Sequence, residues 1–324
     1  MGEKQSGMAV DLSVVIVSFN VRELLRGCLQ ALVPSSKFQV PSSGVCSVEH
    51  ETWNMELIVV DNASADGSAA MVQQEFPAVQ LIVNTENRGY AAANNQGISA
   101  AHGRYVLLLN PDTVVLDEAL ANLVRFLDEH PRAGAVGGRL LHADGSFQHS
   151  AFRFPTLTMT LLDFFPRHRL LDSALNGRYP RAWYDHAFPI DHPLGACLAV
   201  RRETFEQVGL LDEGFFIYCE EVDWCWRIKQ AGWEIWYVPD APVIHYVAQS
   251  TRQFRYPMFV ELWKSRYRLF AKHRPAWWQA LNRQLVRLGL WAEMRRAHAA
   301  RQRGEISQQE LAERLAAYQQ VARL

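Results

Sequence analysis

The stretch LSVVIVSFN, residues 12–20, decides the fold class of this chain. Its first six residues are largely β-branched and, apart from Ser13, apolar, which is typical of a strand buried on both faces. The stretch ends in the polar residues Ser18 and Asn20. Residues 22–32 then carry apolar side chains at helical spacing. This strand, turn and helix predict an α/β domain with helices on both faces of a mostly parallel sheet.

The same alternation continues along the chain. We predict strands at 56–60, 79–83, 105–109, 135–141, 194–200 and 233–238, and helices at 69–76, 89–101, 117–129, 202–208 and 222–231. Residues 34–54 contain two prolines and five serines without clear periodicity, so we expect an inserted surface loop there. We therefore expect a catalytic domain over residues 1–250 and a helical extension over 251–324. The catalytic domain would consist of a nucleotide-binding half at 12–115 and an acceptor half at 116–250.

Length and composition narrow the class further. A chain of 324 residues that is 49% hydrophobic can bury a large core. Its five cysteines lack the spacing of a disulfide framework or a zinc site, which favours a reducing compartment. The first ten residues lack the pattern of a secretory signal, and every apolar run is shorter than the ~20 residues that a bilayer requires. We therefore expect a cytoplasmic protein.

Charge is divided unevenly along the chain. From Arg252 onward there are 15 Lys or Arg against five Asp or Glu, whereas the rest of the chain is acidic. This basic extension also shows aromatic and apolar residues at helical spacing. Such helices suit the anionic cytoplasmic face of the inner membrane. It is an equal alternative that they dock on the catalytic domain or pair in a homodimer. No nucleic-acid motif accompanies the charge, so we expect no nucleic-acid partner.

Polar residues follow the predicted strands where a parallel sheet binds its ligands. Asp61 and Asn62 follow one strand, and Asn110-Pro111-Asp112 follows another. The Asp112 carboxylate is a suitable ligand for Mg²⁺ or Mn²⁺ beside a diphosphate, because hard cations prefer oxygen. The alternative is a simple turn, which Asn and Asp also favour.

A second group of acids lies in Glu220-Glu221-Val222-Asp223, at the start of a predicted helix. One of these carboxylates can act as a general base, and the alternative is that they only favour the helix dipole. His245 comes shortly after the last predicted strand. Its imidazole is either structural or a further ligand of the cation bound by Asp112.

The order of these parts resembles glycosyltransferase family 2, the inverting transferases with a GT-A fold, and especially its bacterial rhamnosyltransferase and galactofuranosyltransferase-like branch. The matching stretches are SVVIVSFN (13–20), LIVVDNASADGS (57–68), NTENRGYAAANNQGISAA (84–101), YVLLLNPDTVV (105–115) and LGACLAVRRETFEQVGLLDEGFFIYCEEVDWCWRIKQAGWEIWYVPDAPVIHY (194–246). This resemblance covers about residues 12–250.

The resemblance implies a role for each matching residue. Asp61 stands where the family binds the nucleobase, and Asp112 and His245 stand where it ligates a divalent cation. Asn110 replaces the first acid of the family's DxD motif. Glu221 takes the position of the general base, with Glu220 and Asp223 as alternatives. The remaining residues that the resemblance places beside the nucleotide are Ser18, Asn20, Asn62, Arg88 and Asn94.

The implied activity is metal-assisted transfer of rhamnose or a similar sugar, with inversion, from a nucleotide-diphosphate donor to a hydroxyl of a polysaccharide or lipid-linked glycan. Biosynthesis of a cell-wall or surface polysaccharide is the expected setting. A sugar nucleotidyltransferase and a catalytically degenerate sugar-nucleotide or glycan-binding module are the alternatives.

Overall fold

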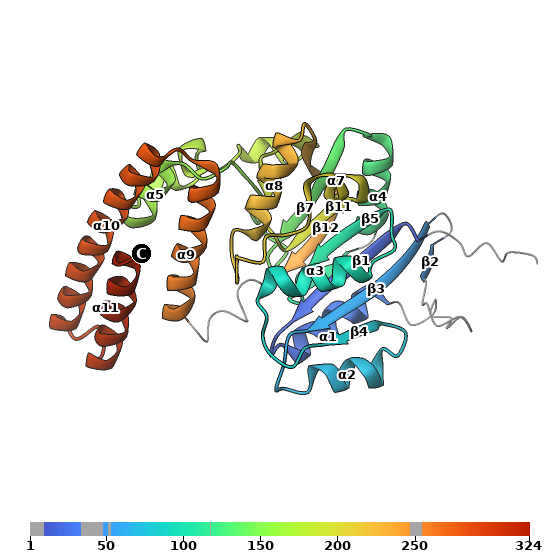
Figure 1. The fold of residues 1–324 in the computed structure, drawn as a ribbon, viewed down its shortest axis with the longest axis horizontal. Coiled ribbons are helices and arrows are strands. Elements are labelled where there is room, and N and C mark those ends of the chain that lie inside the picture. Colours follow the sequence, from blue (N-terminus) through green and yellow to red (C-terminus); the bar gives the residue numbers. More distant parts are fainter. Residues whose placement is uncertain (1–9, 34–47, 51–52, 117, 247–254) are drawn as a thin grey trace, which may run out of the picture.

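The computed structural model describes residues 10–33, 48–50, 53–116, 118–246 and 255–324. It contains a mixed central sheet with helices on both faces, and a group of C-terminal helices stands beside one end of this sheet (Figure 1). Within the described residues the sheet has ten strands in the order β2-β3-β1-β5-β11-β7-β12-β6, with β4 paired to β3 and β9 paired to β12.

The strands of this sheet are β1 (Leu12–Ser18), β2 (Val48–His50), β3 (Trp53–Asp61), β4 (Gln80–Val83), β5 (Tyr105–Leu109), β6 (Thr113–Val115), β7 (Ala133–Leu141), β9 (Phe188–Pro189), β11 (Cys197–Arg201) and β12 (Glu234–His245). A small second sheet joins β8 (Ala151–Phe152) and β10 (His192–Pro193). The helices are α1 (Arg22–Leu32), α2 (Ser68–Glu75), α3 (Tyr90–Ala100), α4 (Ala119–Glu129), α5 (Leu157–Phe164), α6 (His168–Leu171), α7 (Arg202–Val208), α8 (Glu220–Gln230), α9 (Arg255–His273), α10 (Ala276–Gln302) and α11 (Gln308–Ala322), with short 3-10 turns at Ala174–Asn176 and Arg181–Trp183.

The first half of the sheet has the parallel arrangement that the sequence predicts. Strand β1 pairs in parallel with both β3 and β5, and β3 pairs in parallel with β4. In the register of β1 and β3, Ser18 lies opposite Asp61, so the polar strand ends meet at one edge. The second half is mixed, because β11 runs antiparallel to β5 and β7.

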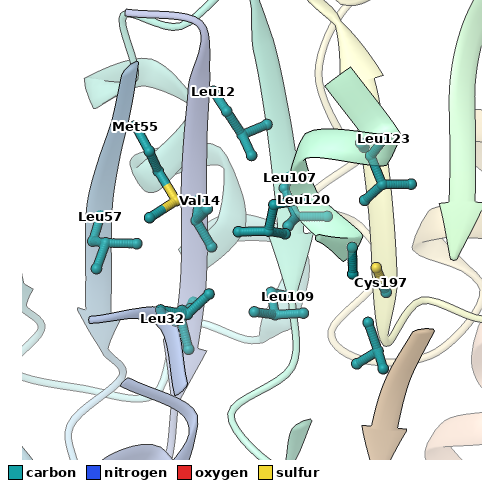
Figure 2. Packing of buried hydrophobic residues seen from close by; sticks show 14 of the residues in the cluster. Leu12, Val14, Leu32, Met55, Leu57, Leu107, Leu109, Leu120, Leu123 and Cys197 are labelled. Carbon is teal, nitrogen blue, oxygen red and sulfur yellow. The ribbon is translucent and has the colours of Figure 1, made fainter. Parts of the chain in front are cut away.

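Both faces of the sheet are covered, which explains the continuous apolar strands. Leu12 and Val14 of β1 pack in one cluster with residues of α1, α2 and α4, whereas Val15 packs on the other face with residues of α3, α7 and α8. Figure 2 shows side chains of β1, β3 and β5 gathered with Leu32 of α1 and with Leu120 of α4. Successive residues of a strand point to opposite faces, so one strand contributes to both clusters.

Several predicted boundaries differ from the structure. Strand β12 extends to His245 rather than ending at residue 238, because it continues alongside β7 and β6. Helix α8 begins at Glu220 instead of residue 222. Within the predicted loop 34–54, residues 48–50 form β2 and pair with β3. Residues 34–47 and Asp117, the first residue of the predicted helix 117–129, lie outside the described residues.

The C-terminal helices dock on the rest of the chain, which supports one of the three interpretations of the basic extension. Lys272 of α9 forms ion pairs with Asp212 and with Asp223 of α8. Helix α10 packs against α5, where the Thr160 hydroxyl donates a hydrogen bond to Asn282 at 2.8 Å. In the described parts of the chain, every helix is too short or too polar to cross a bilayer.

We predict that the close approach of α3 to β1 makes Gly97 intolerant of a side chain. A Cβ at Gly97 would overlap the Val15 side chain, whereas a Cβ at Gly27 in α1 would enter open space. Gly97→Ala should lower the free energy of unfolding by about 1–3 kcal/mol through overpacking. The matched Gly27→Ala should raise it by up to about 1 kcal/mol, because alanine favours helix. Urea unfolding measures both changes, and equal effects would contradict the packing argument.

Candidate active site

A cavity of about 400 Å³ lies at the carboxyl edge of the parallel strands. It is lined by residues that follow β1, β3 and β5, by the start of α3, by residues preceding α8 and by the end of β12. Six of the site residues expected from the sequence line it: Asn62, Asn110, Asp112, Glu220, Glu221 and His245. The fold therefore brings the acids and the histidine from distant parts of the chain into one cavity.

Asp112 and His245 lie side by side in this cavity. The Nε2 atom of His245 is 3.5 Å from the Oδ1 atom of Asp112, and both side chains are 7% exposed. Strand pairing fixes this proximity, because His245 lies opposite Thr113 in the antiparallel register of β12 and β6. The Tyr246 N–H also donates to the Asp112 carbonyl oxygen at 2.9 Å.

This pair can contribute two ligands to a divalent cation. Within the described residues, no group of three or more His, Cys, Asp or Glu side chains is arranged to hold a metal. Two protein ligands still suit Mg²⁺ or Mn²⁺ at a diphosphate, since substrate phosphates and water supply the other ligands. The residues therefore fit a cation that binds together with a phosphorylated ligand.

Gln148 contacts the far side of the His245 ring and was not anticipated from the sequence. Its Nε2 atom lies 3.2 Å from His245 Nδ1, and its own Oε1 atom is buried without a partner among the described residues. If the Gln148 amide is turned over, its Oε1 atom can accept a hydrogen bond from the Nδ1–H group of His245. The Nε2 atom of His245 is then free to bind a cation. Gln148 follows a segment without recognisable motif, so only spatial proximity reveals it.

Tyr90 fixes the orientation of Asn110. The Tyr90 hydroxyl donates a hydrogen bond of 2.8 Å to the Asn110 Oδ1 atom, and burial raises the pKa of this phenol. Because Oδ1 is engaged in this bond, the amide nitrogen of Asn110 is the group left to face a ligand. Asn110 is thus arranged as a neutral hydrogen-bond donor beside Asp112.

Glu220 and Glu221 enter the cavity from the first turn of α8. The two preceding residues, Tyr218 and Cys219, have left-handed backbone conformations with φ of 70° and 66°. Such conformations cost about 1–3 kcal/mol each in non-glycine residues and cluster at functional sites. They turn the chain sharply before α8, so that its N-terminus presents both carboxyl groups to the cavity.

Burial raises the pKa of both carboxyl groups. For Glu220 the pKa is raised well above its usual value, because the charge of Glu221 adds to the effect of burial. For Glu221 the backbone N–H groups of Glu221 and Val222 act in the opposite direction and favour the ionised form. One Oε2 atom of each side chain is buried without a protein partner in the described parts of the chain.

Ser18, Asp61 and Asn62, which the resemblance places beside the nucleotide, lie together at the ends of β1 and β3. Ser18 and Asp61 are buried beside the cavity-lining residues, and the Ser18 Oγ and Asp61 Oδ1 atoms have no partner among the described residues. The Asn62 amide bonds to Asn87 and to the Gly89 carbonyl oxygen, which orders the loop before α3. Unpartnered buried oxygens at this edge indicate that a polar ligand binds there.

Five of the residues predicted to bind the nucleotide do not line the cavity: Ser18 and Asp61, together with Asn20, Arg88 and Asn94. The Asn20 Oδ1 atom accepts a hydrogen bond from the Ala65 N–H, so this side chain holds the loop after β3. Arg88 is exposed, and Asn94 is buried in α3 with its amide nitrogen bonded to the Tyr90 carbonyl oxygen. The sequence did not reveal where these side chains point, because their orientation depends on the geometry of the turns that carry them.

The structure places the alternative base Asp223 outside the cavity. Its side chain is fully buried outside the cavity and forms ion pairs with Arg227, Lys272 and His273. Burial raises its pKa, but the hydrogen bonds from His273, Lys272 and Arg227 outweigh that effect and lower it. Asp223 therefore anchors α9 to α8. Its side chain points away from that of Glu221, because residues two apart on a helix do not share a face.

Comparison with known proteins identifies the class of enzyme. The model of the family described as glycosyl transferase family 2 matches residues 13–209, and the chain belongs to this family. An N-acetylglucosaminyl-diphospho-decaprenol L-rhamnosyltransferase of Mycobacterium tuberculosis is 31% identical over 249 residues, which cover 72% of this chain and 80% of the relative. The rhamnosyltransferase WbbL of Escherichia coli is 26% identical over 197 residues, covering 57% of this chain and 72% of the relative.

A solved structure supports the fold. The mannosyltransferase PcManGT of Pyrobaculum calidifontis, in complex with GDP-Man and Mn²⁺, superposes with a TM-score of 0.55 at 18% identity, covering 97% of this chain and 86% of that chain. The predicted GT-A fold is thereby confirmed. The chain is a glycosyltransferase, and these findings favour this activity over a sugar nucleotidyltransferase or a degenerate binding module.

We predict that removal of the Asp223 charge destabilises the fold more than removal of the Asp163 charge. Asp223→Asn should lower the free energy of unfolding by about 2–4 kcal/mol, because it leaves buried cationic groups without their partner. Asp163→Asn is a matched control, since Asp163 forms a partly exposed ion pair with Arg266 and its loss should cost about 0–1 kcal/mol. Urea unfolding tests the difference, and an unchanged stability of Asp223→Asn would contradict the anchoring role.

Proposed function

We propose that this glycosyltransferase moves rhamnose or a related sugar from a nucleotide-diphosphate donor to a hydroxyl of a polysaccharide or lipid-linked glycan, with inversion at the anomeric carbon. One observation carries the proposal: the buried carboxyl of Glu221 and the Asp112–His245 pair line the same cavity. The names of the two rhamnosyltransferase relatives support the choice of sugar. Synthesis of a cell-wall or surface polysaccharide is the proposed setting.

The donor is proposed to lie along the strand ends. Ser18, Asp61 and Asn62 would bind its base and ribose, since two of them have unpartnered buried oxygens. Asp112 and His245 would hold Mg²⁺ or Mn²⁺ against the diphosphate, and such a cation offsets the charge of the leaving group. Asn110 would add a neutral donor beside it, so the protein supplies only one carboxylate to this cation.

Glu221 is proposed as the general base. Its carboxylate accepts the proton of the acceptor hydroxyl while the hydroxyl oxygen forms a bond to the anomeric carbon. The bond from this carbon to the diphosphate breaks in the same step, and its electron pair leaves with the phosphate oxygen. The sugar is therefore inverted, and no side chain needs to form a covalent intermediate.

The environment favours Glu221 over Glu220 for this role. Two neighbouring buried carboxyl groups do not both ionise readily, because each charge opposes the other. The pKa of Glu220 is raised well above its ordinary value, so Glu220 keeps its proton while Glu221 ionises first. Glu220 then serves as a neutral neighbour that excludes water.

Work at a membrane surface is part of the proposal. The name of the Mycobacterium tuberculosis relative describes a lipid-linked diphosphate acceptor, and the basic C-terminal helices of this chain suit anionic lipid. A location at the cytoplasmic face of a membrane would bring the enzyme to such an acceptor. The protein would bind this surface from one side, as a peripheral protein.

We predict that Glu221→Gln abolishes transfer, because glutamine cannot accept the proton, and a loss of about 10²–10⁴-fold in kcat is expected. Glu220→Gln is the matched control and should keep most of the activity, since it replaces a neutral acid with a neutral amide. Release of the nucleoside diphosphate, measured with acceptor present, compares the two. If Glu220→Gln is inactive and Glu221→Gln is active, the base role belongs to Glu220. Full activity in both variants would show that neither residue is the general base.

The pH dependence tests the same assignment. Transfer requires ionised Glu221, so kcat/KM should fall as pH decreases through its pKa, which burial raises above the usual 4.5. The same fall of kcat/KM at low pH should be seen in Glu220→Gln. Melting temperatures of both Gln variants at neutral pH should not decrease, because a buried acid with a raised pKa destabilises the fold once it is ionised.

We predict that cation binding depends on three residues. Asp112→Asn and His245→Ala should each remove the increase in melting temperature that Mn²⁺ adds to a nucleoside diphosphate, because bound ligand stabilises only the native state. Gln148→Ala should weaken Mn²⁺ binding by about tenfold, as expected for a group that orients a ligand. The exposed His298→Ala serves as control. Unchanged Mn²⁺ affinity in all three variants would exclude this cation site.

A further inference from the structure

The outward face of α10 carries an apolar stripe that the fold itself does not use. Four of the large apolar side chains that the described residues leave exposed lie on this one helix: Trp277, Leu281, Leu288 and Trp291, which are 45% to 67% exposed. Their spacing of four, seven and three residues places them along one line of an α-helix. The line extends for about 21 Å, at about 1.5 Å per residue.

The opposite face of α10 already fills the core of the C-terminal helices. Val286 and Leu290 are fully buried with Phe164 of α5 and Trp263 of α9. Close packing requires Gly289, where a Cβ would overlap the Phe164 ring. The exposed stripe is therefore an additional apolar surface, and Figure 1 shows α10 at the edge of the molecule away from the central sheet.

The charge around this stripe is strongly positive. Helix α10 contains five arginines and one acid, Glu293, which is already paired with Arg296. Arg283, Arg287 and Arg295 are exposed, and the guanidinium carbon of Arg295 lies 4.9 Å from the centre of the Trp291 ring. The stripe thus combines exposed tryptophan and leucine with arginines, and the one acidic residue of the helix, Glu293, is paired with Arg296.

We propose that this face of α10, which we call the α10 stripe (Trp277, Leu281, Leu288 and Trp291 with Arg283, Arg287 and Arg295), docks the enzyme on an anionic lipid surface. Tryptophan and leucine enter the boundary between headgroups and acyl chains, and arginine side chains reach the phosphates from the same helix. The helix lies in the plane of the membrane, because its exposed apolar side chains lie along one face. This inference rests on the work at a membrane surface proposed above and assigns it to one face of one helix.

Charge complementarity favours lipid over a second copy of the chain. Two copies joined through the stripe would bring their arginines together, and like charges at an interface disfavour association. Anionic headgroups neutralise the same arginines. The stripe lies outside the cavity of the active site, so lipid binding and sugar transfer can be tested separately.

The test is cosedimentation with vesicles of phosphatidylcholine containing increasing fractions of phosphatidylglycerol, using the full chain. We expect binding that rises with phosphatidylglycerol and decreases with salt. The double variant Trp277→Ser and Trp291→Ser should lose about tenfold or more in partitioning, because it removes the inserted rings. The triple variant Arg283→Gln, Arg287→Gln and Arg295→Gln should lose the preference for phosphatidylglycerol, at about fivefold for each arginine.

Matched controls are available on the catalytic domain. Trp183→Ser removes a tryptophan that is 47% exposed, and the triple variant Arg22→Gln, Arg125→Gln and Arg132→Gln removes three exposed arginines. Both should bind vesicles as the parent does, and circular dichroism should show that every variant is folded. Donor hydrolysis with Mn²⁺ should be equal in all of them, so a loss of lipid binding cannot be mistaken for a loss of catalysis.

Three results would overturn the proposal. The first is that the parent protein binds no vesicles of any composition, and the second is that the controls lose as much binding as the α10 variants. Light scattering could instead show a dimer of the parent that the double serine variant converts to a monomer without any lipid binding. That last result would assign the stripe to contact between copies.

Discussion

The pairing of β12 with β6 is the interaction on which the candidate active site depends. It places His245 opposite Thr113 and joins the Tyr246 N–H to the Asp112 carbonyl oxygen, although these segments are far apart in the chain. A slip of one residue would turn His245 to the other face of the sheet, because strand side chains alternate. Strand β12 is held against such a slip by its long parallel pairing with β7. The geometry of the Asp112–His245 pair is therefore a property of the sheet and not of a local motif.

Neighbouring acids on one helix have different environments, and this difference decides their roles. At the start of α8, Glu220 and Glu221 face the cavity and have raised pKa values because burial disfavours their charges. Asp223 is also buried, yet hydrogen bonds from His273, Lys272 and Arg227 lower its pKa. Acidic residues in one turn of helix thus include two carboxyl groups that face the cavity and one that joins α8 to α9.

The C-terminal helices are part of the architecture of the site. Met258 of α9 lines the cavity, and Lys272 of the same helix links Asp212 to Asp223 of α8. Helix α5, from the middle of the chain, packs with α10 around Phe164. The boundary expected at residue 250 separates the chain by charge, but packing joins the two sides. One surface of this extension binds the catalytic domain, and the opposite surface of α10 is left for another partner.

The sequence alone determined the alternation of strands and helices, the parallel first half of the sheet and the acids at its edge. These features are local, since apolar periodicity and polar strand ends are written in consecutive residues such as those of β1 and α1. Tertiary structure decided the antiparallel β11, the length of β12, the partners of Asp223 and the contacts that Gln148 and Tyr90 make with His245 and Asn110. The physical reason is that strand direction, hydrogen-bond partners and burial depend on residues brought together only by folding, so no pattern in a single segment contains them.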